Sequence, residues 1–309
     1  MRVILASPRG FCAGVNMVIT CLESAIERFG TPIYVYHEIV HNRWVVRHFQ
    51  DRGVVFVDHI EDVPPGSHLL YSAHGVSPEI RRQAGDRRLE TIDATCPLVT
   101  KVHREAVQFA DQGYTVILIG HAGHDEVVGT MGEAPDAIRL IANTDEADCV
   151  EVADPKRVAY LTQTTLSVDD TRQIVDRLRH RFPGLAGPAR DDICYATQSR
   201  QEVVRRLAPD ADVVLVVGSE NSSNSQRLAE LARGVGAIAH RIDGAADIDP
   251  AWLHGDETIL MTAGASAPEN LVQDCVSYLR ARFEAEVEEV KLREEEVHFV
   301  LPRELRRFP

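Results

Sequence analysis

Three of the six cysteines lie in settings that could bind a metal. Cys12 lies in SPRGFCAGVNMV, Cys96 in TIDATCPLVTKV and Cys194 in ARDDICYATQSR, and each leads into a segment with a helical pattern. They are roughly 90 residues apart along the chain, about the length of one small domain. Three similar α/β units that each donate one cysteine would explain this spacing.

The alternative is a structural role for these cysteines, since a cysteine is most often a small buried apolar residue. We expect this role for Cys21 and Cys275, which fall inside helical patterns, and for Cys149, which lies in an acidic connection. No CxxC pair is present, and six cysteines in so long a chain do not resemble a disulfide framework. For Cys12, Cys96 and Cys194, both a structural role and a metal-ligand role are compatible with the sequence pattern.

A histidine-rich loop offers a second candidate metal site. GHAGHDEV places His121, His124, Asp125 and Glu126 within six residues. The HxxH spacing differs from the i, i+4 spacing with which HExxH presents two histidines on a helix. The loop could equally use its polar side chains to satisfy backbone groups at the end of a strand.

Hydroxyl and amide side chains stand where two helices are predicted to begin. Ser222, Ser223 and Asn224 lie between an apolar strand and the helical segment SQRLAELA, and Ser266 precedes another helix. Helix capping explains such residues in most proteins. Helix N-termini with polar donors also bind anions, and two of them in one unit favour a diphosphate. Neither GxGxxG nor GxxxxGK[ST] occurs, so no standard nucleotide fingerprint is present.

The elements that position these residues follow from the apolar pattern. Continuous β-branched runs are typical of strands buried on both faces, so the sequence predicts an α/β fold with mostly parallel sheets. Ligands of such sheets bind beyond the carboxyl ends of the strands, where each unit offers polar loops, including His41 and His74 in the first and Thr164 in the second. The predicted strands are 3–7, 33–37, 54–58, 69–73, 115–120, 137–141, 158–162, 213–218, 237–242 and 258–262.

Charge and composition limit the partners. The chain of 309 residues has 47 acidic and 33 basic residues, a net charge of −14, which disfavours nucleic acid and membrane surfaces. The start MRVILASPRG lacks the apolar core of a signal peptide, and no run approaches the length of a membrane helix. We expect a cytoplasmic protein with a small ligand or a protein partner.

Nine motifs in order resemble one enzyme family. They are GFCAGV, HEIVHN, YSAHGVSP, DATCPLVTKVH, IGHAGHDEV, TQTTLSVDDT, DDICYAT, VVGSENSSNSQRLAELA and TAGASAP, and they run from residue 10 to residue 268. The set closely resembles the 4-hydroxy-3-methylbut-2-enyl diphosphate reductase (IspH/LytB) family, which catalyses the last step of the methylerythritol phosphate route to isoprenoids. No signature residue is missing.

The resemblance implies a trefoil of three similar small α/β domains around a central iron–sulfur cluster. Cys12, Cys96 and Cys194 would hold one [4Fe-4S] cluster, one from each domain, whereas such clusters normally take four thiolates. The fourth iron would then be open to substrate and could act as a Lewis acid. The expected domains are residues 1–95, 96–193 and 194–282, followed by a C-terminal tail over 283–309.

The resemblance also implies a reaction. Two-electron reductive dehydroxylation would convert (E)-4-hydroxy-3-methylbut-2-enyl diphosphate to isopentenyl diphosphate and dimethylallyl diphosphate. Glu126 would be the proton donor, with His124 and Thr164 placed to orient the hydroxyl and relay protons. The residues that match the family's diphosphate contacts are His41, His74, His124, Ser222, Ser223, Asn224 and Ser266.

The electron donor implied by the resemblance is a flavodoxin or ferredoxin. These carriers are acidic, so docking should use one of the local basic clusters. The charge-rich tail EAEVEEVKLREEEVHFVLPRELRRFP is expected to be a solvated segment with one docked strand at VHFVLP.

Two rival functions are compatible with the same residues. A metal-dependent hydrolase of a phosphorylated small molecule would use His41, His74, His121, His124 and Glu126, with structural cysteines. A non-enzymatic module would bind a diphosphate without turnover under any reductant.

Overall fold

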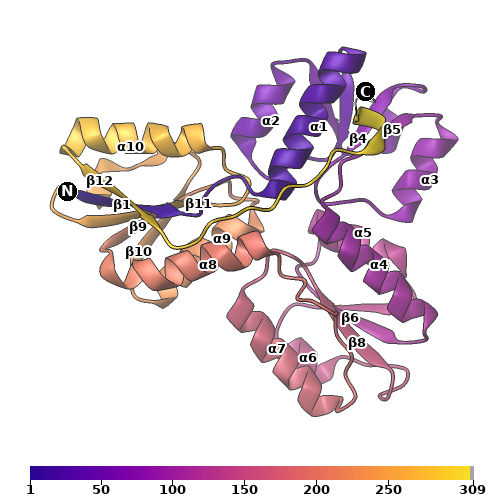
Figure 1. The fold of residues 1–309 in the computed structure, drawn as a ribbon. Helices are drawn as coiled ribbons and strands as arrows, with labels where there is room; N and C mark the ends of the chain where they lie inside the picture. The colour runs from indigo at the N-terminus through magenta and orange to yellow at the C-terminus, as the bar shows by residue number, and fades with distance from the viewer. Residues whose placement is uncertain (307–309) are drawn as a thin grey trace. The chain divides into compact units, whose positions relative to one another are not determined.

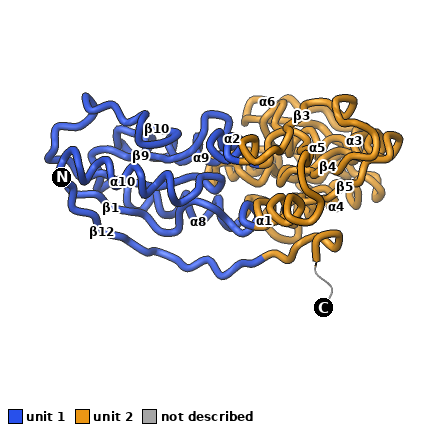
Figure 2. Tube along the Cα trace, turned by 90° about the horizontal axis from the view of Figure 1, so that it is seen from above, with its two compact units in different colours: residues 1–16, 40–48, 195–298 blue, residues 17–39, 49–194, 299–309 orange. Residues whose placement is uncertain are grey.

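The computed structural model describes residues 1–306, which form two compact units (Figure 2). Unit 1 comprises Met1–Asn16, Val40–His48 and Tyr195–His298. Unit 2 comprises Met17–Ile39, Phe49–Cys194 and, of the described residues, 299–306. Each unit is described below by itself.

Unit 1 is built on one five-stranded parallel sheet in the order β10-β9-β11-β1-β12 (Figure 1). The N-terminal strand therefore lies between two strands from the far end of the chain, with Val3 opposite Ile259 and Val287. The strands are β1 (Arg2–Ser7), β9 (Val213–Val217), β10 (Ile238–Ile242), β11 (Thr258–Ala263) and β12 (Glu286–Lys291). The helices are α8 (Tyr195–Leu207), α9 (Ser223–Gly234) and α10 (Glu269–Phe283).

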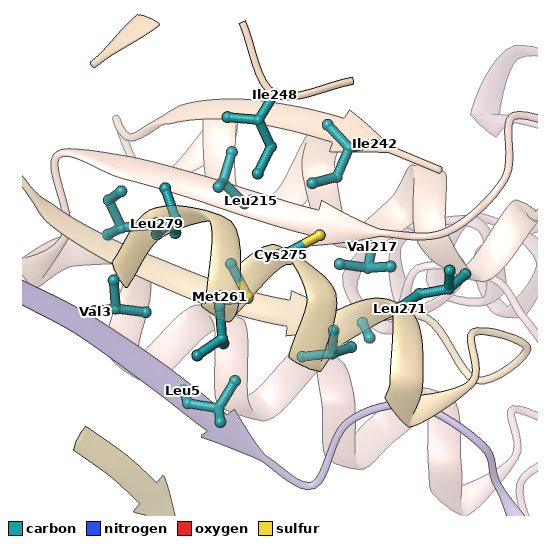
Figure 3. Close-up of a cluster of buried hydrophobic side chains, with 14 of the residues drawn as sticks. Val3, Leu5, Leu215, Val217, Ile242, Ile248, Met261, Leu271, Cys275 and Leu279 are labelled. Atoms are coloured by element: carbon teal, nitrogen blue, oxygen red, sulfur yellow. The ribbon is translucent and has the colours of Figure 1, made fainter. Parts of the chain in front are cut away.

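Helices cover both faces of this sheet. Successive residues of a strand point to opposite faces, so a strand that is apolar at every position needs a partner on each side. Leu215 and Met261 pack with Cys275 of α10 on one face (Figure 3). Val214 and Val216 pack with residues of α8 and α9 on the other. The continuous apolar run VVLVV is thus buried throughout, as expected for a central parallel strand.

Unit 2 contains two further parallel sheets, ordered β3-β2-β4-β5 and β7-β6-β8. Their strands are β2 (Ile33–Tyr36), β3 (Val54–Val57), β4 (His68–Tyr71), β5 (Glu90–Asp93), β6 (Thr115–Ile119), β7 (Ile138–Ile141) and β8 (Val158–Thr162). The helices of the unit are α3 (Pro78–Asp86), α4 (Pro97–Asp111), α5 (Asp125–Glu133), α6 (Thr144–Cys149) and α7 (Val168–Arg181).

Several elements connect or terminate the others. Helices α1 (Ala13–Phe29) and α2 (Arg43–Gln50) each contribute residues to both units. Short 3₁₀ turns occur at Ile60–Asp62, Ala208–Asp210, Ala245–Asp247, Pro250–Trp252 and Arg303–Leu305. No helix within residues 1–306 is both long enough and apolar enough to cross a membrane.

The α/β class with parallel sheets is confirmed, and three sheets fit the expected three-part fold. All ten predicted strands are present, and the structure adds β5 and β12. The prediction of a strand at VHFVLP was wrong. The tail joins the sheet earlier in the sequence, through β12, which pairs with β1. Val287 and Val290 of β12 pack against the two apolar layers of the sheet, whereas Val300 of VHFVLP is exposed. The domain boundaries stay predictions, although β1 pairs with β11 and β12 rather than with strands of residues 33–93.

Candidate functional site

Each of the three candidate cysteines directly precedes a helix. Cys12 precedes α1, Cys96 is the N-cap residue of α4, and Cys194 precedes α8. All three are half-buried and form no disulfide. The positive end of a helix stabilises a thiolate, which is the form of cysteine that binds metals.

The backbone holds these cysteines against loops that follow strands. The N–H of Cys12 donates to the carbonyl of Ala265 at 3.2 Å, after β11. The other two bonds have the same form: Cys96 donates to Ala73 after β4 and Cys194 to Thr164 after β8, each at 3.0 Å. The cysteines therefore stand at the carboxyl ends of parallel strands, where such sheets bind ligands.

The other three cysteines differ from these in burial. Cys21 in α1 and Cys275 in α10 are fully buried, and burial raises the pKa of each thiol to about 12. They are neutral apolar residues, as expected. The prediction that Cys149 is buried was wrong, since it ends the short helix α6 in an acidic surface segment and is exposed.

Glu126 and Thr164 form the central polar contact of unit 2. Thr164 donates its backbone N–H to Oε1 of Glu126 at 2.7 Å and its hydroxyl to Oε2 at 2.8 Å. Both residues are buried, and Glu126 is only 2% exposed. Burial raises the pKa of Glu126 to about 7, against the lowering effect of the Thr164 hydrogen bonds. A carboxylic acid with such a pKa can donate a proton at neutral pH.

Histidines lie beside this acid at the start of α5. His124 is the N-cap residue of α5, and its Nδ1 accepts the backbone N–H of Glu126 at 3.2 Å. The neutral ring of His124 therefore carries its proton on Nε2. The ring of His74 lies edge-on to that of His124, with centroids 5.9 Å apart.

Asp125 was visible in the sequence only as part of the histidine-rich loop, yet it contacts two histidines. Its Oδ1 lies 2.6 Å from Nδ1 of His37 and its Oδ2 lies 3.8 Å from Nδ1 of His74. The hydrogen bond to Asp125 is the largest cause of the raised pKa of His37. Asp125 thus places a negative charge beside both histidines, while Nδ1 of His74 lies within hydrogen-bond distance of Oγ of Ser72, at 3.3 Å.

A partly buried ion pair, which sequence reasoning missed, connects two of the cysteine segments within unit 2. Lys101 of α4, the helix that follows Cys96, donates to Oδ1 of Asp192 and to the carbonyl of Arg190, each at 2.6 Å. Oδ2 of Asp192 accepts the backbone N–H of Thr162 at 2.9 Å. Burial raises the pKa of Asp192 to about 6, and the charge of Asp192 in turn raises the pKa of Glu126.

In unit 1, the start of α9 carries the predicted anion-binding residues. Ser222 is the N-cap residue, and its Oγ accepts the N–H of Ser225 at 3.3 Å and the hydroxyl of Ser225 at 2.9 Å. Oγ of Ser223 and both amide atoms of Asn224 are buried without a hydrogen-bond partner among residues 1–306. Buried polar groups normally have partners, so these donors point to a ligand.

Ser266 belongs to the same group, but it caps no helix. Its hydroxyl donates to the carbonyl of His41 at 2.9 Å and lies 3.4 Å from Oγ of Ser222, while Pro268 is the N-cap residue of α10. A Cβ atom at Gly218 or Gly264 would overlap with Oγ of Ser225, so only glycine fits beside this hydroxyl. Ser225 is a further buried residue of the site that the sequence did not single out.

Within each unit, the structure thus brings together a defined set of the expected residues. Unit 1 holds Cys12, His41, Ser222, Ser223, Asn224 and Ser266, and unit 2 holds His74, Cys96, His124, Glu126, Thr164 and Cys194. Counted over both units, they are three thiols, one buried acid, three histidines and five uncharged donors.

Comparison with known proteins gives a single result over the whole chain. The family model for the LytB protein matches residues 3–280. The 4-hydroxy-3-methylbut-2-enyl diphosphate reductase of Rhodopirellula baltica is 57% identical over 308 residues, which cover 100% of this chain and 97% of that protein. The reductase of the same name from Serratia proteamaculans is 55% identical, over 99% of this chain and 98% of that protein.

Solved structures agree. The E-1-hydroxy-2-methyl-but-2-enyl-4-diphosphate reductase of Plasmodium falciparum matches with a TM-score of 0.95 and 37% identity, over 98% of this chain and 96% of that chain. A structure described as (E)-4-hydroxy-3-methyl-but-2-enyl diphosphate reductase, the terminal enzyme of the non-mevalonate pathway, matches with a TM-score of 0.64 and 29% identity, over 91% and 100%. On these grounds, the chain belongs to the LytB family.

Proposed function

We propose that this protein is a 4-hydroxy-3-methylbut-2-enyl diphosphate reductase, which removes the allylic hydroxyl of its substrate to give isopentenyl diphosphate and dimethylallyl diphosphate. The reaction consumes two electrons and two protons and releases water. The observation that carries the proposal is the placement of Cys12, Cys96 and Cys194, each at the start of a helix, in a chain similar over its whole length to reductases of that name.

The donor set fits one [4Fe-4S] cluster held by these three cysteines. All three cysteines are half-buried and outside any disulfide, and helix starts favour the thiolate form of a cysteine. When bound, the cluster would supply electrons one at a time and, at an iron without a protein ligand, a Lewis acid.

The polar groups of unit 1 are proposed to bind the diphosphate. Ser223 and Asn224 offer buried donors that have no partner within residues 1–306, and they stand at the positive end of α9. Ser222, Ser266 and His41 are further proposed contacts in this unit, and the family resemblance adds His74 and His124 to the proposal. A strongly acidic chain can thus bind a polyanion, because local donors rather than net charge determine the affinity.

Glu126 is proposed as the proton donor. Hydroxide is a poor leaving group, so the C–O bond breaks more easily when the departing oxygen is protonated. Because the pKa of Glu126 is about 7, a large fraction of this carboxyl carries a proton at neutral pH. The Thr164 hydroxyl, 2.8 Å from Oε2, can pass that proton on, and His124 can orient the substrate hydroxyl through Nε2.

The electron donor is proposed to be a flavodoxin or ferredoxin, in the cytoplasm. Such carriers are acidic, and clustered arginines are the local charges that could attract them. One such group is Arg81, Arg82, Arg87 and Arg88, around α3.

The decisive experiment combines metal analysis with cysteine replacement. Anaerobically purified protein should be brown, contain about three to four irons per chain and reduce the hydroxylated diphosphate when given a strong chemical reductant. The Cys12→Ser, Cys96→Ser and Cys194→Ser triple variant should lose iron and turnover, whereas Cys149→Ser, an exposed control, should keep both.

The same experiment separates the rival functions. A metal-dependent hydrolase would keep its activity in the triple variant, and a binding module would bind diphosphate without turnover in either protein. Iron-free wild-type protein that is colourless and active would overturn the proposal.

A further inference from the structure

The segment that follows β12 carries an acidic side chain into the interior of unit 1. Glu295 forms a bidentate ion pair with Arg200 of α8, with 2.9 Å between Nη1 and Oε1 and 3.3 Å between Nη2 and Oε2. The segment runs along α8 in Figure 1, after β12 has paired with β1. Arg200 is fully buried, so Glu295 supplies the countercharge that such a site requires.

The other donors of Arg200 bind the loop that carries Cys12. Its Nε and Nη2 donate to the carbonyl of Gly10 at 3.2 and 2.6 Å, and its Nη1 also donates to the carbonyl of Ala196 at 3.0 Å. Gly10 has a φ of 65°, and a Cβ atom there would lie 3.0 Å from the carbonyl oxygen of Ala267. The loop is therefore held in a conformation that only glycine adopts easily, two residues before Cys12.

The same helix holds the other side of Cys12. The backbone N–H of Ala13 donates to the hydroxyl oxygen of Tyr195, the first residue of α8, at 3.0 Å. The N–H of Cys12 itself donates to Ala265. Residues 10, 12 and 13 are thus each fixed by a separate hydrogen bond, and two of the three depend on side chains of α8.

We propose that Arg200 and Glu295 are positioning residues that fix the Cys12 thiol for cluster binding, and that the C-terminal segment locks this ligand in place. The inference rests on the proposed function, because a fixed Cys12 loop matters only where Cys12 binds the cluster. Removal of the Glu295 carboxylate leaves a buried guanidinium without a countercharge, so Arg200 must move or recruit water. Movement of Arg200 breaks its bonds to the Gly10 carbonyl, and recruited water competes for them, so each response loosens the Cys12 loop.

The first test uses cluster-free protein and needs no activity. Native apoprotein is treated with iodoacetamide, and alkylation of each cysteine is followed by mass spectrometry. We expect Glu295→Ala to raise the rate at Cys12 by about tenfold, with little change at Cys96 and Cys194. Glu295→Gln, which keeps the shape but not the charge, should give an intermediate increase, and Glu296→Gln, at an exposed neighbour, should match wild type.

The second test uses the iron-loaded protein. We expect the iron–sulfur absorption band of Glu295→Gln to decay several-fold faster than that of wild type in the presence of a chelator, with Glu296→Gln again unchanged. Equal rates at Cys12 and equal decay in Glu295→Gln and Glu296→Gln would overturn the inference, and so would equal acceleration at all three cysteines, which indicates general loosening. Wild-type protein that takes up no iron would instead refute the proposed function. The alkylation rates are measured on cluster-free protein, so they would still show whether Glu295 fixes the Cys12 loop.

Discussion

Thr164 gives both of its donors to one carboxyl group: its N–H lies 2.7 Å from Oε1 of Glu126 and its hydroxyl 2.8 Å from Oε2. When Glu126 is ionised, both bonds stabilise the carboxylate. When Glu126 is protonated, the hydroxyl bond can reverse, and Oε2 then donates to Oγ1 of Thr164. The pair can therefore hold a proton or pass it on without any movement of the backbone.

Glu126→Gln should bind iron and substrate as wild type does but lose most turnover. The amide has the shape of the acid and can accept the Thr164 N–H, but it cannot donate a carboxyl proton. General acid catalysis typically contributes about 10² to 10⁴-fold, so a loss of that order is expected in single-turnover assays with a strong reductant. Glu151→Gln, at an exposed glutamate, is the control. Near-normal turnover would assign the acid to another group.

The pH dependence of stability should reveal the raised pKa of Glu126. Its pKa is about 7 in the folded protein against an ordinary 4.5, so the folded state holds this proton more tightly than the unfolded state does. That contribution is complete below about pH 4.5 and is lost as pH rises through about 7. Glu126→Gln lacks this loss, so its melting temperature should rise relative to that of wild type across this interval.

The expected difference in unfolding free energy reaches on the order of 1 to 3 kcal/mol at pH 8. Thermal denaturation of both proteins at a series of pH values measures it. A difference that is the same at pH 4.5 and at pH 8 would show that the carboxyl group titrates normally.

Thr164→Val tests the hydroxyl alone. Valine keeps the volume and the backbone N–H but removes the donor to Oε2 of Glu126, which leaves a buried carboxyl oxygen without its partner. We expect a stability loss of about 1 to 3 kcal/mol, measured by denaturant unfolding, and at least tenfold slower turnover. Thr164→Ser should recover most of both, and a Val variant that turns over at the wild-type rate would remove the hydroxyl from the proton path.

Local pattern was sufficient for most strands and failed at two edge strands, β5 and β12. VVLVV is buried on both faces and shows a continuous apolar run. β5 and β12 are edge strands, and their sequences ETID and EVEEVK expose most side chains, which is how edge strands avoid pairing with other molecules. Because both segments are rich in charged residues, their sequences resemble loops between secondary-structure elements.

Some residues of the candidate site could likewise be found from local sequence pattern, and others could not. Cys96 and Ser222 could be found because a helix start has local signals in proline, serine and the apolar residues that follow. In DDIC, by contrast, nothing local distinguishes exposed Asp191 from Asp192, which is buried against Lys101. Contacts of that kind depend on segments about 90 residues apart, so they become visible only when the chain has folded.

A negative charge at position 224 should weaken diphosphate binding. Both amide atoms of Asn224 are buried without a partner within residues 1–306, at the start of α9. Asn224→Asp keeps the size of the side chain but replaces a potential donor by a carboxylate, which repels the ligand. We expect about tenfold to hundredfold weaker binding of inorganic diphosphate, measured by calorimetry. Asn221→Asp is the matched control, because it adds the same charge three residues earlier at an exposed position. Equal weakening in both variants would indicate a general charge effect, and no change in Asn224→Asp would place the diphosphate away from the start of α9.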